Sequence, residues 1–126
     1  MKRGFVVYGQ DKLDEVSISA PTTICEIKDG FYRTNVITPE QFGLKRATKA
    51  EIVGGTPAEN AEITKGILAG EITGAKRDIV LLNAGLGFYI TGKTETMEDG
   101  VKMAQSLIEA KAGLDTLQKF IEVSNA

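Results

Sequence analysis

Two adjacent carboxylates, Asp14 and Glu15, are the residues in this sequence best suited to chemistry. They lie in a loop that follows an apolar run over residues 5–8, and Gly9 breaks that run. The run is typical of a buried strand, and in an α/β protein ligands bind beyond the carboxyl ends of strands. Mg²⁺ prefers one or two carboxylates together with phosphate oxygens of a substrate. The pair therefore predicts a magnesium site, and a solvated acidic turn after a strand is the alternative interpretation.

Histidine is absent from the sequence and Cys25 is the only cysteine. These two facts exclude a Ser-His-Asp or Cys-His catalytic machine and a zinc site with histidine or several thiolates. Cys25 has no partner for an internal disulfide, and nothing near it in the sequence stabilises a thiolate. We therefore expect the reducing cytoplasm as the compartment, and acid–base or metal chemistry that depends on carboxylates, lysines or tyrosines.

The composition is that of an ordinary globular protein. The 126 residues suffice for one domain with a hydrophobic core, with 42% hydrophobic and 25% charged residues. The formal net charge is -2 and the charges are mixed along the chain, so no basic surface is expected to bind nucleic acid. No run reaches the roughly 18 apolar residues that a membrane span needs, and the first four residues do not begin a signal peptide.

The strand-rich part is expected over residues 1–54. Asp29-Gly30 is a strong hairpin signal, and it predicts an antiparallel hairpin of residues 22–28 with residues 31–36. Thr38-Pro39 predicts the start of a short helix that ends at Gly43. The first strand, within residues 4–8, has the continuous apolar character of a strand in a parallel sheet.

The helical part is expected over residues 55–126, because caps, prolines and apolar periodicity recur there. Thr56 and Thr96 are placed as N-caps, and Gly113 is expected to end a helix. Gly85 and Gly87 each lower helix propensity by about 1 kcal/mol relative to alanine, so we expect close backbone packing to compensate. The fold class is thus α/β, with one or two parallel-type strands, an antiparallel hairpin and a layer of about four helices. The predicted helices cover residues 57–69, 75–91, 97–112 and 114–123.

Several sequence blocks are spread over nearly the whole chain. They are VVYGQDKLDEVS at 6–17, SAPT at 19–22, QFGL at 41–44, GGTPAENA at 54–61, LAG at 68–70, LLNA at 81–84 and YITGK at 89–93. Together they resemble anthranilate phosphoribosyltransferases, in the order and at about the spacing of that family. Nucleoside phosphorylases share the fold of that family and match these blocks less well.

The resemblance implies a role for the carboxylate pair. In the family, the Asp and Glu that correspond to Asp14 and Glu15 bind the Mg²⁺ that accompanies phosphoribosyl pyrophosphate. The family's enzymes join the nitrogen of anthranilate to the anomeric carbon of the ribose and release pyrophosphate, a step of tryptophan biosynthesis. A metal held by carboxylates suits a leaving group with a large negative charge. The sequence departs from the family at Tyr8, where many relatives have histidine, and at Ala20, where glycine is usual and alanine is expected to stiffen the loop.

The resemblance covers only the C-terminal part of the family's large α/β domain. The family's glycine-rich phosphate loop, its anthranilate-binding residues and its small helical domain lie upstream of the matching blocks. We therefore expect residues 1–126 to form one segment that is inactive alone. The strand within residues 4–8 is expected to be central in an intact sheet, so an exposed edge and apolar faces should promote self-association.

Several alternatives stay open from the sequence. Gly54-Gly55-Thr56 is interpreted as a helix start, with a phosphate site as the alternative. Asn60 and Asn83 are expected to satisfy loop or helix-end groups. Lys12 is an exposed turn residue or a phosphate contact, and Phe88 and Tyr89 are core residues or a pair that stacks on a ligand. For the whole segment, the alternatives are a non-catalytic self-associating interaction module, an inert fragment, one half of a split enzyme, or a pyrimidine nucleoside phosphorylase-type glycosyltransferase.

Overall fold

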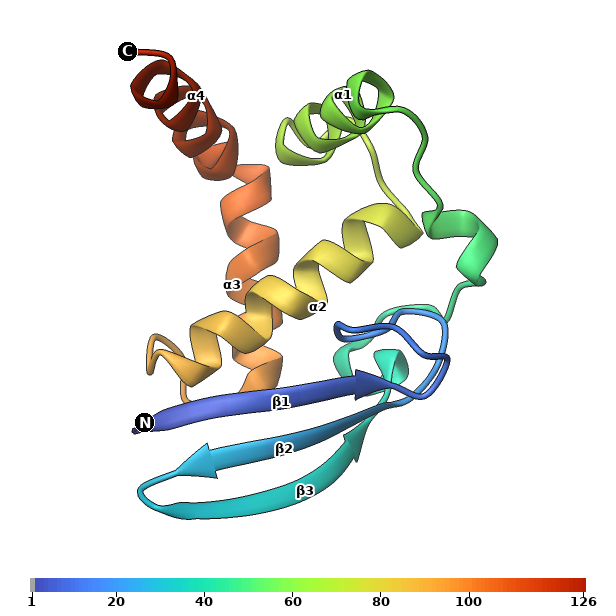
Figure 1. The fold of residues 1–126 in the computed structure, drawn as a ribbon, viewed down its shortest axis with the longest axis vertical. Coiled ribbons are helices and arrows are strands. Elements are labelled where there is room, and N and C mark those ends of the chain that lie inside the picture. The colour runs from blue at the N-terminus through green and yellow to red at the C-terminus, as the bar shows by residue number, and fades with distance from the viewer. Residues whose placement is uncertain (1) are drawn as a thin grey trace.

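The computed structural model describes residues 2–126 and shows a three-stranded sheet followed by helices (Figure 1). This arrangement confirms the α/β class, the hairpin and the four helices predicted after it. Two short 3-10 helices, η1 and η2, connect the sheet to the helical part. The elements are β1 (Arg3–Gly9), β2 (Thr22–Lys28), β3 (Phe31–Ile37), η1 (Pro39–Phe42), η2 (Lys49–Ile52), α1 (Pro57–Leu68), α2 (Ala75–Ile90), α3 (Met97–Glu109) and α4 (Ala112–Ser124).

The sheet has the order β1-β2-β3, and both pairs are antiparallel. Asp29 and Gly30 join β2 to β3 with φ angles of 53° and 82°, the left-handed values that a two-residue hairpin turn requires. β1 has the apolar run of a parallel-type strand, yet it pairs antiparallel to β2 along its length. Within residues 2–126, the other edge of β1 has no neighbouring strand. A parallel neighbour for β1 is therefore not contained in the described chain.

The two faces of the sheet differ in their exposure. Phe5 and Val7 of β1 and Ile24 of β2 contribute to the core between the sheet and the helices. On the opposite face, Val6 and Tyr8 are 62% and 52% exposed. The apolar run over residues 5–8 predicts a strand covered on both faces, whereas only one face is covered in the described residues. The run carries apolar side chains on both faces, so the second face is available for a further layer.

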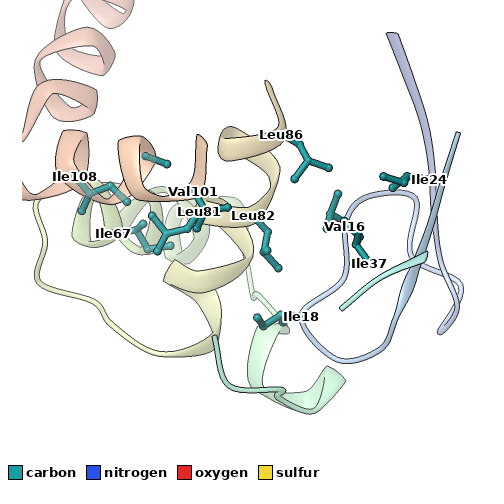
Figure 2. Close-up of a cluster of buried hydrophobic side chains, with 11 residues drawn as sticks. Val16, Ile18, Ile24, Ile37, Ile67, Leu81, Leu82, Leu86, Val101 and Ile108 are labelled. Carbon is teal, nitrogen blue, oxygen red and sulfur yellow. The ribbon is translucent and has the colours of Figure 1, made fainter. Parts of the chain in front are cut away.

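The hydrophobic core lies between the sheet and α2, and continues to α1 and α3 (Figure 2). Leu81, Leu82 and Leu86 of α2 are its central members, which agrees with the strongly apolar sequence of that helix. Val16 and Ile18, which follow the carboxylate pair, are 3% and 0% exposed. The segment after Glu15 is thus anchored in the core. The buried hydrophobic residues are Val16, Ile18, Ile24, Ile37, Ile67, Leu81, Leu82, Leu86, Val101, Ala104 and Ile108.

α2 and α3 approach each other through two glycines. A Cβ added to Gly85 would lie 2.6 Å from the backbone nitrogen of Val101, and one added to Gly100 would lie 2.1 Å from the carbonyl oxygen of Gly85. The predicted compensation by close packing is therefore confirmed for Gly85. It is wrong for Gly87, which has no such neighbour within 4 Å and lines an open groove between β1 and α2.

The helix boundaries follow the predicted caps more closely than the predicted glycine stop. The hydroxyls of Thr56 and Thr96 accept hydrogen bonds from backbone N–H groups in the first turns of α1 and α3. The break between α3 and α4 lies at Lys111, which has a left-handed φ of 59°, and not at Gly113. Gly113 lies inside α4, where a Cβ would be 2.9 Å from a methyl group of Leu68. Its missing side chain thus accommodates α1. Among residues 2–126, no helix combines the length and the apolar character that spanning a membrane requires.

Candidate functional site

Asp14 and Glu15 lie exposed in the loop that connects β1 to β2. Although Glu15 is exposed, neighbouring atoms shield its carboxyl from part of the surrounding water. This partial desolvation, and then the negative charge of Asp14, raise the pKa of the Glu15 carboxyl above its ordinary value. None of the ion pairs found among residues 2–126 involves either side chain. The pair is therefore a concentration of negative charge that its own protein does not neutralise, and a cation beside it would lower its energy.

The donor set fits hydrated Mg²⁺ better than a metal enclosed by protein ligands. In the part of the chain that the structure describes, no group of three or more metal-ligating side chains comes together. Mg²⁺ commonly binds through one or two carboxylates and completes its shell with water and phosphate oxygens. Asp14 and Glu15, both exposed, would be able to provide this minimal protein contribution.

Asp11 organises the loop that carries the pair. Its Oδ2 accepts hydrogen bonds from the hydroxyl of Ser17, at 2.9 Å, and from the hydroxyl of Ser19. Burial raises the pKa of Asp11, but the hydrogen bonds from Ser19 and Ser17 outweigh burial and leave the pKa below its ordinary value. The Nζ of Lys49 donates to the carbonyl oxygen of Asp11. Asp11 thus ties both arms of the loop together, a role that the sequence analysis did not identify.

The close turn at the start of the loop requires Gly9. The Gly9 N–H donates to the carbonyl of Leu13 at 2.9 Å, and the Lys12 N–H donates to the carbonyl of Gly9 at 2.8 Å. A Cβ on Gly9 would lie 2.8 Å from Oδ1 of Asp11 and 3.2 Å from Cβ of Ser17. Lys12 is exposed, with a left-handed φ of 73°, which is the turn position expected for it. A side chain at residue 9 would therefore force Asp11, Leu13 or Ser17 to shift.

Asn83 of α2 holds the residue that follows the pair. Its Oδ1 accepts a hydrogen bond from the N–H of Val16 at 3.0 Å, and its Nδ2 donates to the carbonyl of Val16 at 3.0 Å. The same Nδ2 donates to the carbonyl of Ile79, one turn earlier in α2, at 2.9 Å. The prediction that Asn83 satisfies loop groups is confirmed, and the loop proves to be the one that contains Glu15.

Asn60 makes a similar contact elsewhere. Its Oδ1 accepts from the N–H of Gly55 at 2.8 Å, and its Nδ2 donates to the carbonyl of Gly55 at 3.2 Å. Thr56 caps α1 by accepting from the N–H of Glu59 at 3.2 Å. Both Asn60 and Thr56 occupy backbone donors at this helix start. The contacts support the interpretation of the glycine pair as a helix start, because these donors are not directed at an external anion.

Tyr89 belongs to the interface between α2 and the sheet. Its hydroxyl donates to Oε2 of the buried Glu26 at 2.7 Å, and this hydrogen bond, together with burial, raises the pKa of Tyr89. The Arg3 guanidinium lies 5.0 Å from the centroid of the Tyr89 ring, and Phe5 stacks on that ring with centroids 5.8 Å apart. Tyr89 is half-buried beside the core, with its ring and hydroxyl engaged within the chain. Phe88 packs against the hydrophobic core, so the core interpretation is confirmed for Phe88.

The fold and the carboxylate loop agree with one class of protein. The family model described as "Glycosyl transferase family, a/b domain" matches residues 1–113, so the chain belongs to this family.

The more particular likeness is to anthranilate phosphoribosyltransferases. The enzyme of that name from Methanobrevibacter smithii is 45% identical over 126 residues, which are 100% of this chain and 37% of the relative. The one from Lachnoclostridium phytofermentans is 46% identical over 125 residues, or 99% of this chain and 37% of the relative.

Solved structures show the same likeness. The anthranilate phosphoribosyltransferase of Thermus thermophilus has a TM-score of 0.89 and 35% identity, and the match covers 98% of this chain and 36% of that one. The enzyme from Saccharomyces cerevisiae in complex with PRPP and Mg has a TM-score of 0.89 and 28% identity, with the same coverage of 98% and 36%. The chain thus spans little more than a third of the length of these relatives.

Proposed function

We propose that this segment supplies the magnesium-binding carboxylates, Asp14 and Glu15, of an anthranilate phosphoribosyltransferase. The reaction is transfer of phosphoribose from phosphoribosyl pyrophosphate to anthranilate, in tryptophan biosynthesis. The observation that carries the proposal is an exposed, unneutralised carboxylate pair on a tightly held loop. The 45% identity over the whole chain to the Methanobrevibacter smithii enzyme supports it, as does the yeast relative in complex with PRPP and Mg.

The chemistry asked of this chain is electrostatic. Bound Mg²⁺ would neutralise the negative charge that develops on departing pyrophosphate. Asp14 and Glu15 would hold the cation, and the loop would fix their direction. Because the pKa of Glu15 is raised without a cation, binding of a cation favours its ionised form. No residue of this chain is assigned as a nucleophile or a general base.

We further propose that the donor's phosphate loop and the anthranilate-binding residues lie outside residues 1–126. The chain spans 37% of the Methanobrevibacter smithii relative, which leaves room for them elsewhere. Residues 1–126 then act as one segment, with a strand-rich part at 1–54 and a helical part at 55–126, and are inactive alone. A cytoplasmic setting is part of the proposal and is supported by the free thiol of Cys25.

The test is loss of anthranilate fluorescence in the presence of phosphoribosyl pyrophosphate and Mg²⁺. The chain is assayed alone, and then mixed with the upstream part of a family enzyme. Activity is expected only in the mixture, and the Asp14→Ala/Glu15→Ala double variant should abolish it. Turnover by the chain alone would refute the claim that it is inactive by itself. Phosphorolysis of thymidine by the mixture, without transfer to anthranilate, would favour a pyrimidine nucleoside phosphorylase-type activity instead.

We propose self-association as a second property, and the outer face of the sheet favours it. Tyr32 and Val36 of β3 are 78% and 55% exposed, on the same face as Val6 and Tyr8 of β1. Apolar sheet faces and unpaired strand edges promote association between chains. Sedimentation should therefore show concentration-dependent oligomers that Tyr8→Lys weakens. Val123→Lys, on the exposed end of α4, is the control, and a monomer at all concentrations would contradict the proposal.

A further inference from the structure

We propose that Asn83 is a positioning residue, which fixes the peptide between Glu15 and Val16 and so sets the direction of the Glu15 carboxylate. The inference rests on the proposed function, because it assigns a role to Asn83 in the same metal site. Asn83 lies in the middle of α2, and 67 residues of sequence separate it from Val16.

The contact is specific in its geometry. The Asn83 amide accepts a hydrogen bond from the Val16 N–H and donates one to the Val16 carbonyl, each at 3.0 Å. This is the same two-bond pattern that a residue in a neighbouring strand would make. The carbonyl of Ile79 holds the same Nδ2 at 2.9 Å and limits rotation of the amide. An aspartate in this position keeps the acceptor and loses the donor. The asparagine amide is therefore the group that matches both sides of the Val16 backbone.

The contact acts on Glu15 through the chain. The peptide group that carries the Val16 N–H also carries the carbonyl of Glu15, and this group is planar. The backbone at Glu15 is therefore restricted in two ways. Asn83 holds the Val16 N–H, and the Val16 side chain is buried, with 3% exposure. Removing a residue that orients a metal ligand, without binding the metal itself, typically lowers metal affinity by about 10–100-fold. The same size of effect is expected here.

Asn60 provides a matched control within the same chain. It holds the backbone N–H and carbonyl of Gly55 with the same two-point contact, at the start of α1. Asn60→Ala removes an amide and its two hydrogen bonds to Gly55. Asn83→Ala likewise removes an amide and its two hydrogen bonds to Val16, together with the one to Ile79. A general consequence of losing such a contact should therefore appear in both variants, whereas a positioning role in the metal site should appear only at Asn83.

The probe is Mn²⁺ in place of Mg²⁺, because its paramagnetism reports free and bound metal directly. Titrations of the full chain with Mn²⁺ are followed by electron paramagnetic resonance, with Asp14→Ala/Glu15→Ala to define binding at the pair. Asn83→Ala should weaken that binding by about tenfold or more, and Asn60→Ala should leave it unchanged. Asn83→Asp preserves the side-chain size and the acceptor, and it replaces Asn83→Ala if the latter does not fold. Hydrogen exchange at the Val16 amide is measured in the same proteins.

The outcomes separate the inference from the proposed function. Weaker Mn²⁺ binding with faster exchange at Val16, in the Asn83 variants alone, would support the positioning role. A folded Asn83→Ala chain that binds Mn²⁺ as tightly as the unchanged chain would overturn it. So would an equal loss of affinity in Asn60→Ala. If the unchanged chain shows no Mn²⁺ binding that depends on Asp14 and Glu15, the proposed function itself fails, and the positioning role fails with it.

Discussion

Replacing Gly85 by alanine places a methyl group in the contact between α2 and α3. Its Cβ would lie 2.6 Å from the nitrogen and 2.7 Å from the Cα of Val101. Both are backbone atoms, so the overlap is relieved only when the two helices move apart. Gly87, two positions further along α2, has no such neighbour within 4 Å and provides the matched control. Because α2 carries Asn83, movement of this helix would also disturb the carboxylate loop.

Two opposing effects determine the expected magnitude. Alanine stabilises a helix by about 1 kcal/mol relative to glycine, at either position. Overpacking a close contact costs about 1–3 kcal/mol, and contact with backbone atoms should lie at the upper end of that range. Gly85→Ala should therefore lower the free energy of unfolding by about 2 kcal/mol, the difference between the two effects. Gly87→Ala should raise it by about 1 kcal/mol, since only the helix propensity changes.

Urea unfolding followed by far-UV circular dichroism measures both variants against the unchanged chain. With a slope of about 2 kcal/mol per molar, the midpoint should fall by about 1 M for Gly85→Ala and rise by about half that for Gly87→Ala. Midpoints that move in the same direction for the two variants would refute the reasoning. A lower midpoint for Gly87→Ala would show that, in solution, other atoms occupy the space that a Cβ at residue 87 needs.

Three further substitutions test the loop and the sheet. Gly9→Ala, whose Cβ would lie 2.8 Å from Oδ1 of Asp11, should weaken Mn²⁺ binding about tenfold, and unchanged affinity would contradict the close packing of the loop. The pKa of Asp11 is lowered in the folded protein, so ionised Asp11 stabilises the fold. This contribution is fully present above the ordinary pKa of 3.8 and is lost as pH falls through the lowered value. Urea unfolding at several pH values should show Asp11→Asn less stable near neutral pH and equal to the unchanged chain in acid, and a pH-independent difference would count against this origin. Tyr89→Phe removes the 2.7 Å hydrogen bond to the buried Glu26 and should cost about 1–3 kcal/mol in unfolding free energy, whereas no loss would mean that water replaces the hydroxyl.

The sequence predicted the elements whose signals are local. Asp29-Gly30 specifies the hairpin, because few other residue pairs tolerate φ angles of 53° and 82° in succession. Thr56 and Thr96 cap α1 and α3 because each hydroxyl reaches an N–H only three residues away. The helix break at Lys111 was missed, since a lysine carries no signal for a left-handed conformation and Gly113, two residues later, does.

The candidate site divides in the same way. Asp14 and Glu15 were proposed as the candidate metal ligands from the sequence, because adjacent carboxylates after an apolar strand are visible without a structure. Asp11 was missed as a residue that organises the loop, although it lies only a few residues away. Its hydrogen bonds to Ser17 and Ser19 depend on how the loop folds back over Gly9. The sequence therefore gives the type of each side chain, but it does not show which group that side chain hydrogen-bonds to.

By itself, the sequence predicted the order and type of the helices and strands and the family to which the chain belongs, and it proposed the carboxylate pair as the metal site. Only the tertiary structure decided which asparagine holds the carboxylate loop, which glycine lies against a neighbouring helix and which face of β1 is covered. The physical reason is the range of the interactions. Turns and caps are made between residues a few positions apart, whereas Asn83 meets Val16 across 67 residues, through packing that involves the whole chain.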